Sequence, residues 1–229
     1  LANKILMRNE GAELSDSQKL WSRAKRVIPG GNGLLSKRPE MFLPDRWPAY
    51  YASARGSKIT DIDGVEYLDM GLMGVGTNIL GYAHPAVDEA VCKCATSGNM
   101  SSLNCFEEVL LAEKLIEINP WADMVKFART GGEANAISIR IARAVTGRQH
   151  VAVCGYHGWR DWYLAANLPR NDQLDDHHLQ GLDPVGVPRG LTGTTLPFSY
   201  NNADELEYLL ANHSIAAVKM EVSRNSPPE

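Results

Sequence analysis

Residues 124–137 read MVKFARTGGEANAI, and this stretch decides the fold. Residues 124–128 predict a short buried strand, and residues 132–146 predict the helix that follows it. The turn between them contains a pair of glycines, which lets bare backbone approach a ligand. The start of a helix also offers N–H groups and the positive end of its dipole, which suit a phosphate. A tight turn whose glycines merely cap the strand is the competing interpretation.

The rest of the second half repeats this alternation of short strands and helices. Residues 151–154 and 215–220 predict two more buried strands, and residues 203–212 predict a helix. Such alternation is typical of an α/β fold with a parallel sheet. Residues 168–200 are rich in proline, glycine and polar residues without a clear period, and predict a long surface excursion from the sheet.

The first part of the chain has a different texture. Asp63-Gly64 lies between two short apolar segments and predicts a β-hairpin. We expect an N-terminal unit over residues 1–70 and the first part of a larger domain over residues 71–229. Capping residues and apolar spacing also predict helices over residues 15–28, 85–97 and 105–118.

Composition excludes several classes of protein. The chain has 229 residues, of which 44% are hydrophobic and 22% charged, as in ordinary globular domains. A net charge of −4 without a dense basic run argues against partners such as nucleic acid or an anionic membrane. The sequence shows no apolar run long enough to cross a bilayer, and its four cysteines form no CxxC pair. We therefore expect a cytoplasmic protein with reduced thiols that acts on a small molecule.

Six motifs, in the expected order and spacing, resemble the class III family of pyridoxal-phosphate (PLP) enzymes, most closely the branch of glutamate-1-semialdehyde 2,1-aminomutase. The resemblance implies PLP-dependent transferase fold type I, a PLP cofactor, aminotransferase or aminomutase (isomerase) activity, and a homodimer. The motifs lie at residues 23–31, 61–64, 79–85, 130–134, 141–148 and 155–158.

The resemblance also implies which residues hold the cofactor. The turn of residues 130–132 inherits the phosphate, although the usual Ser-Gly-Thr is Thr-Gly-Gly here, so the third position can offer only its backbone N–H. The ring of Tyr156 is expected to stack on the pyridine ring. Glu221 aligns with a family glutamate, although Val222 replaces the usual proline. The expected cofactor-binding set is Thr130, Gly131, Gly132, Tyr156, His157 and Glu221.

Each of the later site residues also has a purely structural interpretation. Tyr156 alone is typical of a half-buried core aromatic. A hydrogen bond at a turn is the alternative role for His157. Glu221 and Lys219 lie two apart on one strand face, where an ion pair at a strand end is the alternative.

PLP chemistry requires a lysine amine, and the family supplies its Schiff-base lysine later in the chain. None of the nine lysines, including Lys126 and Lys219, has the family context. The chain begins at Leu1 and finishes at residues 225–229 just after a strand-like run, so we expect a fragment that is inactive by itself. A catalytically silent α/β module for binding or assembly is the second hypothesis.

Other features are weaker guides to function. Residues 74–76 read Gly-Val-Gly where authentic aminomutases carry a tryptophan, so another amino or keto substrate, such as a sugar, fits at least as well as the semialdehyde. His177-His178 suggests a metal site only weakly, because adjacent side chains point apart on regular elements. Cys92 and Cys94 likewise share no helix face.

Overall fold

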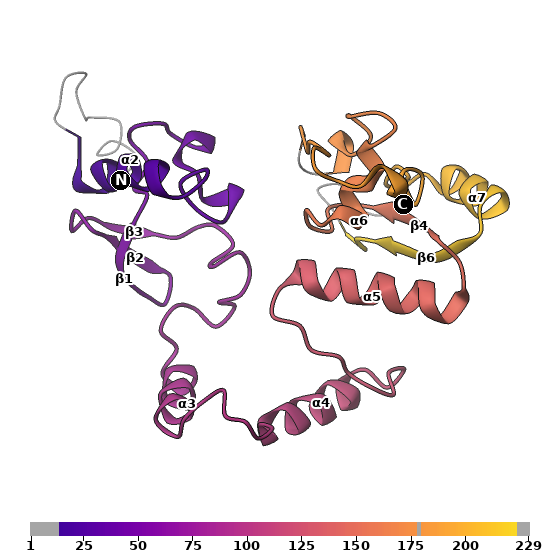
Figure 1. Cartoon of the computed structure of the whole chain (residues 1–229). Helices are drawn as coiled ribbons and strands as arrows, with labels where there is room; N and C mark the ends of the chain where they lie inside the picture. The colour runs from indigo at the N-terminus through magenta and orange to yellow at the C-terminus, as the bar shows by residue number, and fades with distance from the viewer. Residues whose placement is uncertain (1–13, 178–179, 224–229) are drawn as a thin grey trace. The chain divides into compact units, whose positions relative to one another are not determined.

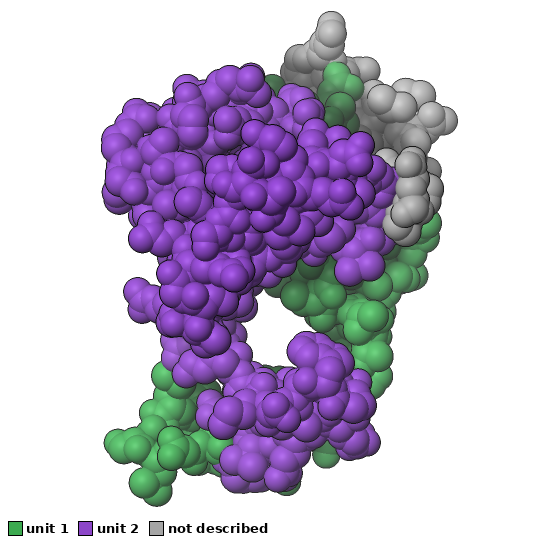
Figure 2. Space-filling model, turned by 90° about the vertical axis from the view of Figure 1, so that its right-hand side faces the viewer, with its two compact units in different colours: residues 1–105 green, residues 106–229 purple. Residues whose placement is uncertain are grey.

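The computed structural model describes residues 14–177 and 180–223 (Figure 1). Contacts divide the chain into two units, residues 1–105 and 106–229 (Figure 2). This division falls after the domain boundary predicted at residue 70, which stays a prediction. The helices and strands are α2 (Asp16–Val27), β1 (Tyr51–Arg55), β2 (Lys58–Asp61), β3 (Glu66–Leu68), α3 (Pro85–Thr96), α4 (Phe106–Ile118), α5 (Gly131–Thr146), β4 (His150–Cys154), α6 (Asp161–Leu164), β5 (Thr195–Pro197), α7 (Ala203–Asn212) and β6 (Ile215–Met220). Short 3-10 turns are η1 (Leu35–Lys37), η2 (Pro39–Met41), η3 (Ala165–Asn167), η4 (Asp175–His177) and η5 (Arg189–Leu191).

The first unit contains the predicted capped helix and hairpin. The Ser15 hydroxyl accepts a 3.3 Å hydrogen bond from the Gln18 N–H and caps α2. Strands β1, β2 and β3 form an antiparallel sheet in that order. Asp63, in the hairpin turn, accepts a 2.8 Å bond from the Asp16 N–H, which ties the start of α2 to the hairpin. Both local predictions are confirmed.

Helices α3 and α4 form where the sequence predicts them, but they bury little. Pro85 opens α3, where its missing N–H is not needed. Neither helix contains a buried residue among those described. On α4, Val109, Leu110 and Ile118 are 56–61% exposed. Their apolar faces therefore lie against solvent in this chain.

The second unit is built on a parallel sheet with the strand order β5-β4-β6. Central strand β4 pairs in parallel with β5 and with β6. The predicted α/β fold class is thus confirmed. Parallel pairing also brings the carboxyl ends of all three strands to one edge of the sheet. Within the described residues, no helix is long and apolar enough to cross a membrane.

Helices α5 and α7 cover opposite faces of this sheet (Figure 1). Alternate residues of β4 point to opposite faces. Val151 and Val153 pack in one cluster with Ile139 of α5. Ala152 and Cys154 pack on the other side, against Leu206 and Leu209 of α7. Residues 151–154 are fully buried, as expected for a central strand between two layers.

The strand predicted over residues 124–128 is wrong. The structure gives these residues no strand pairing within the described part of the chain. Met124 is 88% exposed and Phe127 is 37% exposed. The apolar composition was read correctly, but a strand also needs a neighbouring backbone, and no described strand pairs with this segment.

The surface excursion predicted over residues 168–200 is also wrong. Leu174 is completely buried, and Val187, Thr195 and Phe198 are nearly so. The segment forms two 3-10 turns and contributes β5 to the sheet. Its packing is irregular, which is why its sequence lacks a period although its side chains enter the core.

Candidate active site

The helix predicted after the glycine pair is present as α5, although the strand predicted before it is not. Thr130 is the N-cap of α5, and its hydroxyl accepts a 3.1 Å hydrogen bond from the Glu133 N–H. The Glu133 carboxylate reaches back to accept a 3.0 Å bond from the Arg129 N–H. This reciprocal pair resembles a capping box and fixes the direction in which α5 begins.

The two glycines present backbone rather than side chains at this helix start. Among the described residues, the structure records no acceptor for the N–H of Gly131 or Gly132. A Cβ added to Gly131 would meet no heavy atom within 4 Å. Two unpaired N–H groups at the positive end of a 16-residue helix are suited to an anion such as phosphate.

The turn after β4 lies directly beside the start of α5. The side-chain amide of Asn135 donates a 2.9 Å hydrogen bond to the backbone carbonyl of His157. A Cβ added to Gly158 would lie 3.5 Å from the Cα of Gly132, so the two backbones nearly touch. The structure therefore brings together the two segments that the sequence analysis singled out separately.

Tyr156 lies half-buried in this turn. Its ring meets the ring of Tyr163 edge-on, with 6.0 Å between centroids and an interplanar angle of 87°. It also packs against the cluster that contains Ile139 of α5. Burial raises the pKa of the Tyr156 hydroxyl, so it stays neutral at physiological pH.

His157 points back into the protein. Its side chain is buried, and its Nε2 atom lies 3.0 Å from the carbonyl oxygen of Cys154. Burial lowers the pKa of His157, and the nearby Lys219 charge lowers it further. The hydrogen bond to Cys154 and the charge of Glu221 oppose this shift. The ring is thus engaged with backbone, which matches the structural alternative for this residue.

Gly155 is the position on which the turn depends. Its φ of +97° is one that residues with side chains rarely adopt. Its N–H donates a 3.0 Å bond to Nδ1 of His177, and its carbonyl accepts a 2.8 Å bond from the Tyr163 hydroxyl. The N–H and the carbonyl of Gly155 are therefore both held by buried side chains.

Glu221 closes the other side of Gly155. A Cβ added to Gly155 would lie 2.7 Å from the Cγ, Cδ and Oε2 atoms of Glu221. The Glu221 N–H also donates a 3.2 Å bond to the carbonyl of Cys154, at the carboxyl end of β4. Lys219, two residues earlier, has a pKa lowered by burial. The charges of Glu221 and Lys219 shift the pKa of His157 in opposite directions.

Four residues of this region were not found from the sequence. Asn135 and Arg160 lie beside the two predicted segments, but polar residues near a helix start or a turn are too common to indicate a role. Tyr163 and His177 each hydrogen-bond to Gly155 from segments without periodicity. Only the fold shows that they meet at Gly155.

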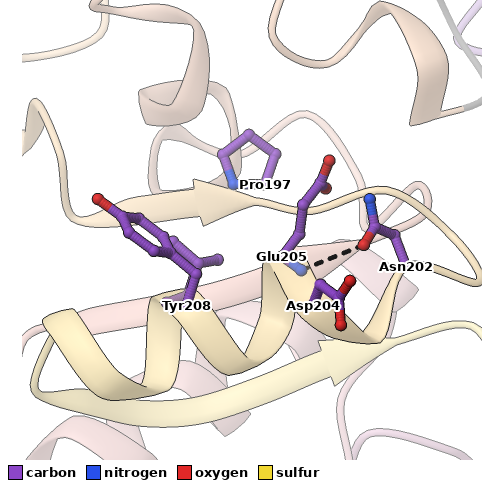
Figure 3. A pocket seen from close by; sticks show the side chains of 6 residues that line it. Pro197, Asn202, Asp204, Glu205 and Tyr208 are labelled. Carbon is purple, nitrogen blue, oxygen red and sulfur yellow. Dashed lines mark hydrogen bonds between the residues drawn. The ribbon is translucent and has the colours of Figure 1, made fainter.

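A separate surface hollow lies over α7 and β5 (Figure 3). Its lining includes two carboxylates, which would repel a phosphate. Glu205 accepts a 2.6 Å bond from the Ser199 N–H, and its own N–H donates to Asn202. These contacts cap α7, so we assign the hollow a structural role. The lining residues are Pro197, Asn202, Asp204, Glu205, Tyr208 and Leu209.

Comparison with known proteins gives a consistent result. The family model for class III aminotransferases matches residues 44–211. Among curated proteins, the chain is 33% identical to 3-aminobutyryl-CoA aminotransferase of Cloacimonas acidaminovorans, over 88% of this chain and 44% of that protein. It is 36% identical to glutamate-1-semialdehyde 2,1-aminomutase of Desulfovibrio desulfuricans, over 90% of this chain and 48% of that protein.

A solved structure agrees with these relatives. A transaminase with PLP bound superposes with a TM-score of 0.79 and 30% identity, covering 96% of this chain and 51% of the other. The chain thus spans about half the length of the proteins it matches. Because the family model covers most of the chain and the matched fold is the same, the chain belongs to the class III aminotransferase family.

Proposed function

We propose that the protein carrying this chain is a PLP-dependent aminotransferase or aminomutase that acts on a small amino or keto compound. The observation that carries the proposal is the hydrogen bond from Asn135 to the carbonyl of His157. It joins a helix start suited to phosphate and an aromatic turn at one edge of a parallel sheet, where open α/β folds bind ligands. Family membership supports the same assignment.

The residues of the site fit PLP. The N–H groups of Gly131 and Gly132 would bind the phosphate, and the open space beside Gly131 leaves room for it. Tyr156 would contact the ring, and its neutral hydroxyl adds no charge there. When bound, PLP supplies the electron sink that amino-group transfer requires. We assign Thr130 to capping the helix that carries these N–H groups.

His157 and Glu221 would support the backbone of this site. Neutral His157 bridges β4 and the turn, and holds the turn in place rather than touching substrate. Glu221 fills the space beside Gly155 and sets a negative charge at the strand edge. We therefore propose that both remain members of the cofactor-binding set, His157 through the backbone that it positions.

We further propose that the lysine that bonds PLP lies outside these 229 residues. The chain matches only about half of each relative. Lys219 is the competing candidate within the chain, because its lowered pKa and its place beside His157 favour a reactive amine. The substrate that we propose is a small amino or keto compound, either a semialdehyde or a sugar-like molecule.

We also propose that the full-length protein is a homodimer located in the cytoplasm. The apolar faces of α3 and α4, which bury nothing in this chain, support a partner surface that a second subunit or the rest of the protein would cover. The silent binding module is the second candidate, but no contact in the structure favours it over the enzyme.

The test uses the full-length protein that contains this sequence. Purified protein should show PLP absorbance, and borohydride should fix the cofactor to a single lysine, which peptide mass spectrometry then locates. We expect a lysine outside residues 1–229 and amino transfer with at least one member of a panel of amino donors and keto acids. A stoichiometric adduct on Lys219 would overturn the lysine assignment. A protein that binds no PLP would overturn the proposed function.

A further inference from the structure

We infer that Arg160 is a phosphate-contacting residue of the proposed cofactor site, because its side chain lies beside the start of α5 at Gly132. This role rests on the proposed function and deepens it, because it concerns how the same site recognises the phosphate. The sequence pattern alone gave Arg160 no role.

The position of the Arg160 side chain is the first observation. A Cβ added to Gly132 would lie 3.4 Å from Nε of Arg160 and 3.7 Å from its Cγ. These are van der Waals distances, so the arginine side chain lies directly beside the helix start. The guanidinium therefore lies beside Gly132, the second residue of α5, and next to the N–H groups at the helix start that could bind an anion.

The backbone of Arg160 is held firmly in that place. Arg160 is the N-cap of α6, and its carbonyl accepts bonds of 2.9 Å from the Tyr163 N–H and 3.1 Å from the Leu164 N–H. The hydroxyl of the same Tyr163 binds the carbonyl of Gly155. The arginine is thus anchored to the turn that carries Tyr156.

The charge at this location is the second observation. A guanidinium beside the positive end of a helix dipole is mildly unfavourable at an exposed position such as Arg160, and a bound anion would offset this repulsion. Within residues 14–177 and 180–223, the structure records no ion pair for Arg160. Its recorded contact is with the ring of Trp159, 5.7 Å from the guanidinium carbon to the centroid. Stacking on a ring leaves the guanidinium N–H donors available at its edge.

A phosphate dianion would supply negative charge beside the helix start and would also accept hydrogen bonds from the guanidinium. It accepts several hydrogen bonds, and arginine matches its geometry with two parallel N–H groups. Two backbone N–H groups from α5 and a guanidinium from the neighbouring turn would surround it from two sides. Arg160 would therefore add a side-chain contact to the phosphate beside Gly132, which offers only its backbone N–H.

The experiment compares cofactors with and without the phosphate. Full-length wild type, Arg160→Met, Arg160→Lys and the control Arg140→Met are freed of cofactor and titrated with PLP and with pyridoxal. Arg140 is an exposed residue of α5, so its variant removes a charge from the same helix away from its start. Circular dichroism of each apoprotein verifies that the fold is unchanged.

We expect Arg160→Met to weaken PLP binding about tenfold or more, as for loss of a hydrogen bond to a charged group. Pyridoxal binding should stay within about twofold of wild type, because pyridoxal offers no phosphate. The PLP affinity of Arg160→Lys should lie between those of wild type and Arg160→Met. Arg140→Met should match wild type with both ligands.

Two other results would overturn the inference. Equal weakening of PLP and pyridoxal by Arg160→Met would show that Arg160 only shapes the turn. Unchanged PLP binding by that variant would show that the phosphate does not meet the guanidinium, while the proposed function would stand. Absence of PLP binding by wild type would remove the proposed function itself.

Discussion

The side-chain amide of Asn135 lies 2.9 Å from the carbonyl oxygen of His157, and this bond couples the first turns of α5 to the turn after β4. The two residues are 22 positions apart in the chain. The bond is partly buried, so the carbonyl would lose its partner without gaining full access to water. Several consequences of this geometry can be measured.

Replacement of Asn135 by alanine should lower both stability and cofactor affinity. The unpaired carbonyl of His157 should cost about 1–2 kcal/mol of unfolding free energy. PLP affinity should fall several-fold because the two halves of the site are no longer joined. Denaturant unfolding and PLP titration of the full-length protein measure the two effects.

Asn212→Ala is the matched control for that variant. Asn212 also donates from its side-chain amide to a backbone carbonyl, that of Tyr208, but at the exposed end of α7. We expect its PLP affinity to equal that of wild type. A PLP affinity in Asn135→Ala equal to that of Asn212→Ala would contradict the coupling role.

Replacement of Gly155 by alanine should be severely destabilising. The backbone φ of +97° is strained for alanine, and the new Cβ would collide with Glu221. We expect a loss of more than about 3 kcal/mol, measured by denaturant unfolding. Gly186→Ala is the control, because Gly186 has a φ of +88° but open space at its Cβ position. Equal losses in both variants would mean that the contact with Glu221 adds nothing.

The stability of the protein should fall as the pH drops below about 6.5. The pKa of His157 is lowered in the folded state, chiefly by burial, so the unfolded chain binds the proton more readily. Its contribution is therefore fully present above the unfolded pKa and is lost as pH falls from there toward the folded pKa. The pKa of His150 is also lowered by burial, with His213 and Arg143 adding to the shift, so it acts in the same direction.

Unfolding free energies between pH 5 and 8 test this dependence in wild type, His157→Gln and His150→Gln. Each single variant should show a shallower loss of stability on acidification than wild type. A profile for His157→Gln as steep as that of wild type would show that the buried imidazole is not a source of the pH dependence.

The 229-residue polypeptide, expressed alone, should self-associate. Helix α4 leaves Val109, Leu110, Leu111 and Ile118 more than half exposed. Apolar surface of this kind drives association and binds hydrophobic dyes. Replacing Leu110 and Leu111 by glutamate should reduce both signals in light scattering and dye fluorescence. Val185→Glu, at an isolated exposed position, should leave them unchanged.

The sequence predicted elements whose signals are local. Ser15, Pro85 and Thr130 open helices through capping chemistry that involves only near neighbours. Asp63-Gly64 likewise specifies its hairpin without help from the rest of the chain. The glycine turn at the start of α5 was located for the same reason, because two glycines and a helix lie within a few residues.

Features that depend on distant partners were missed or misread. Residues 124–128 have the composition of a strand but no backbone to pair with. Leu174 and His177 enter the core from an irregular segment, where no period marks inward-facing positions. The contacts made by Asn135 and Tyr163 are likewise set by tertiary structure, so the supporting half of the site could not be read from spacing.

The place of β4 in the sheet has a consequence for synthesis on the ribosome. Of the three described strands of this sheet the central one is made first, and its buried residues 151–154 have no partner strand of that sheet until β5, which begins 41 residues after Cys154, has emerged. At typical rates of translation this interval lasts about 2–8 seconds. During that time an apolar strand with two open edges is available to chaperones, or to the same strand of another nascent chain.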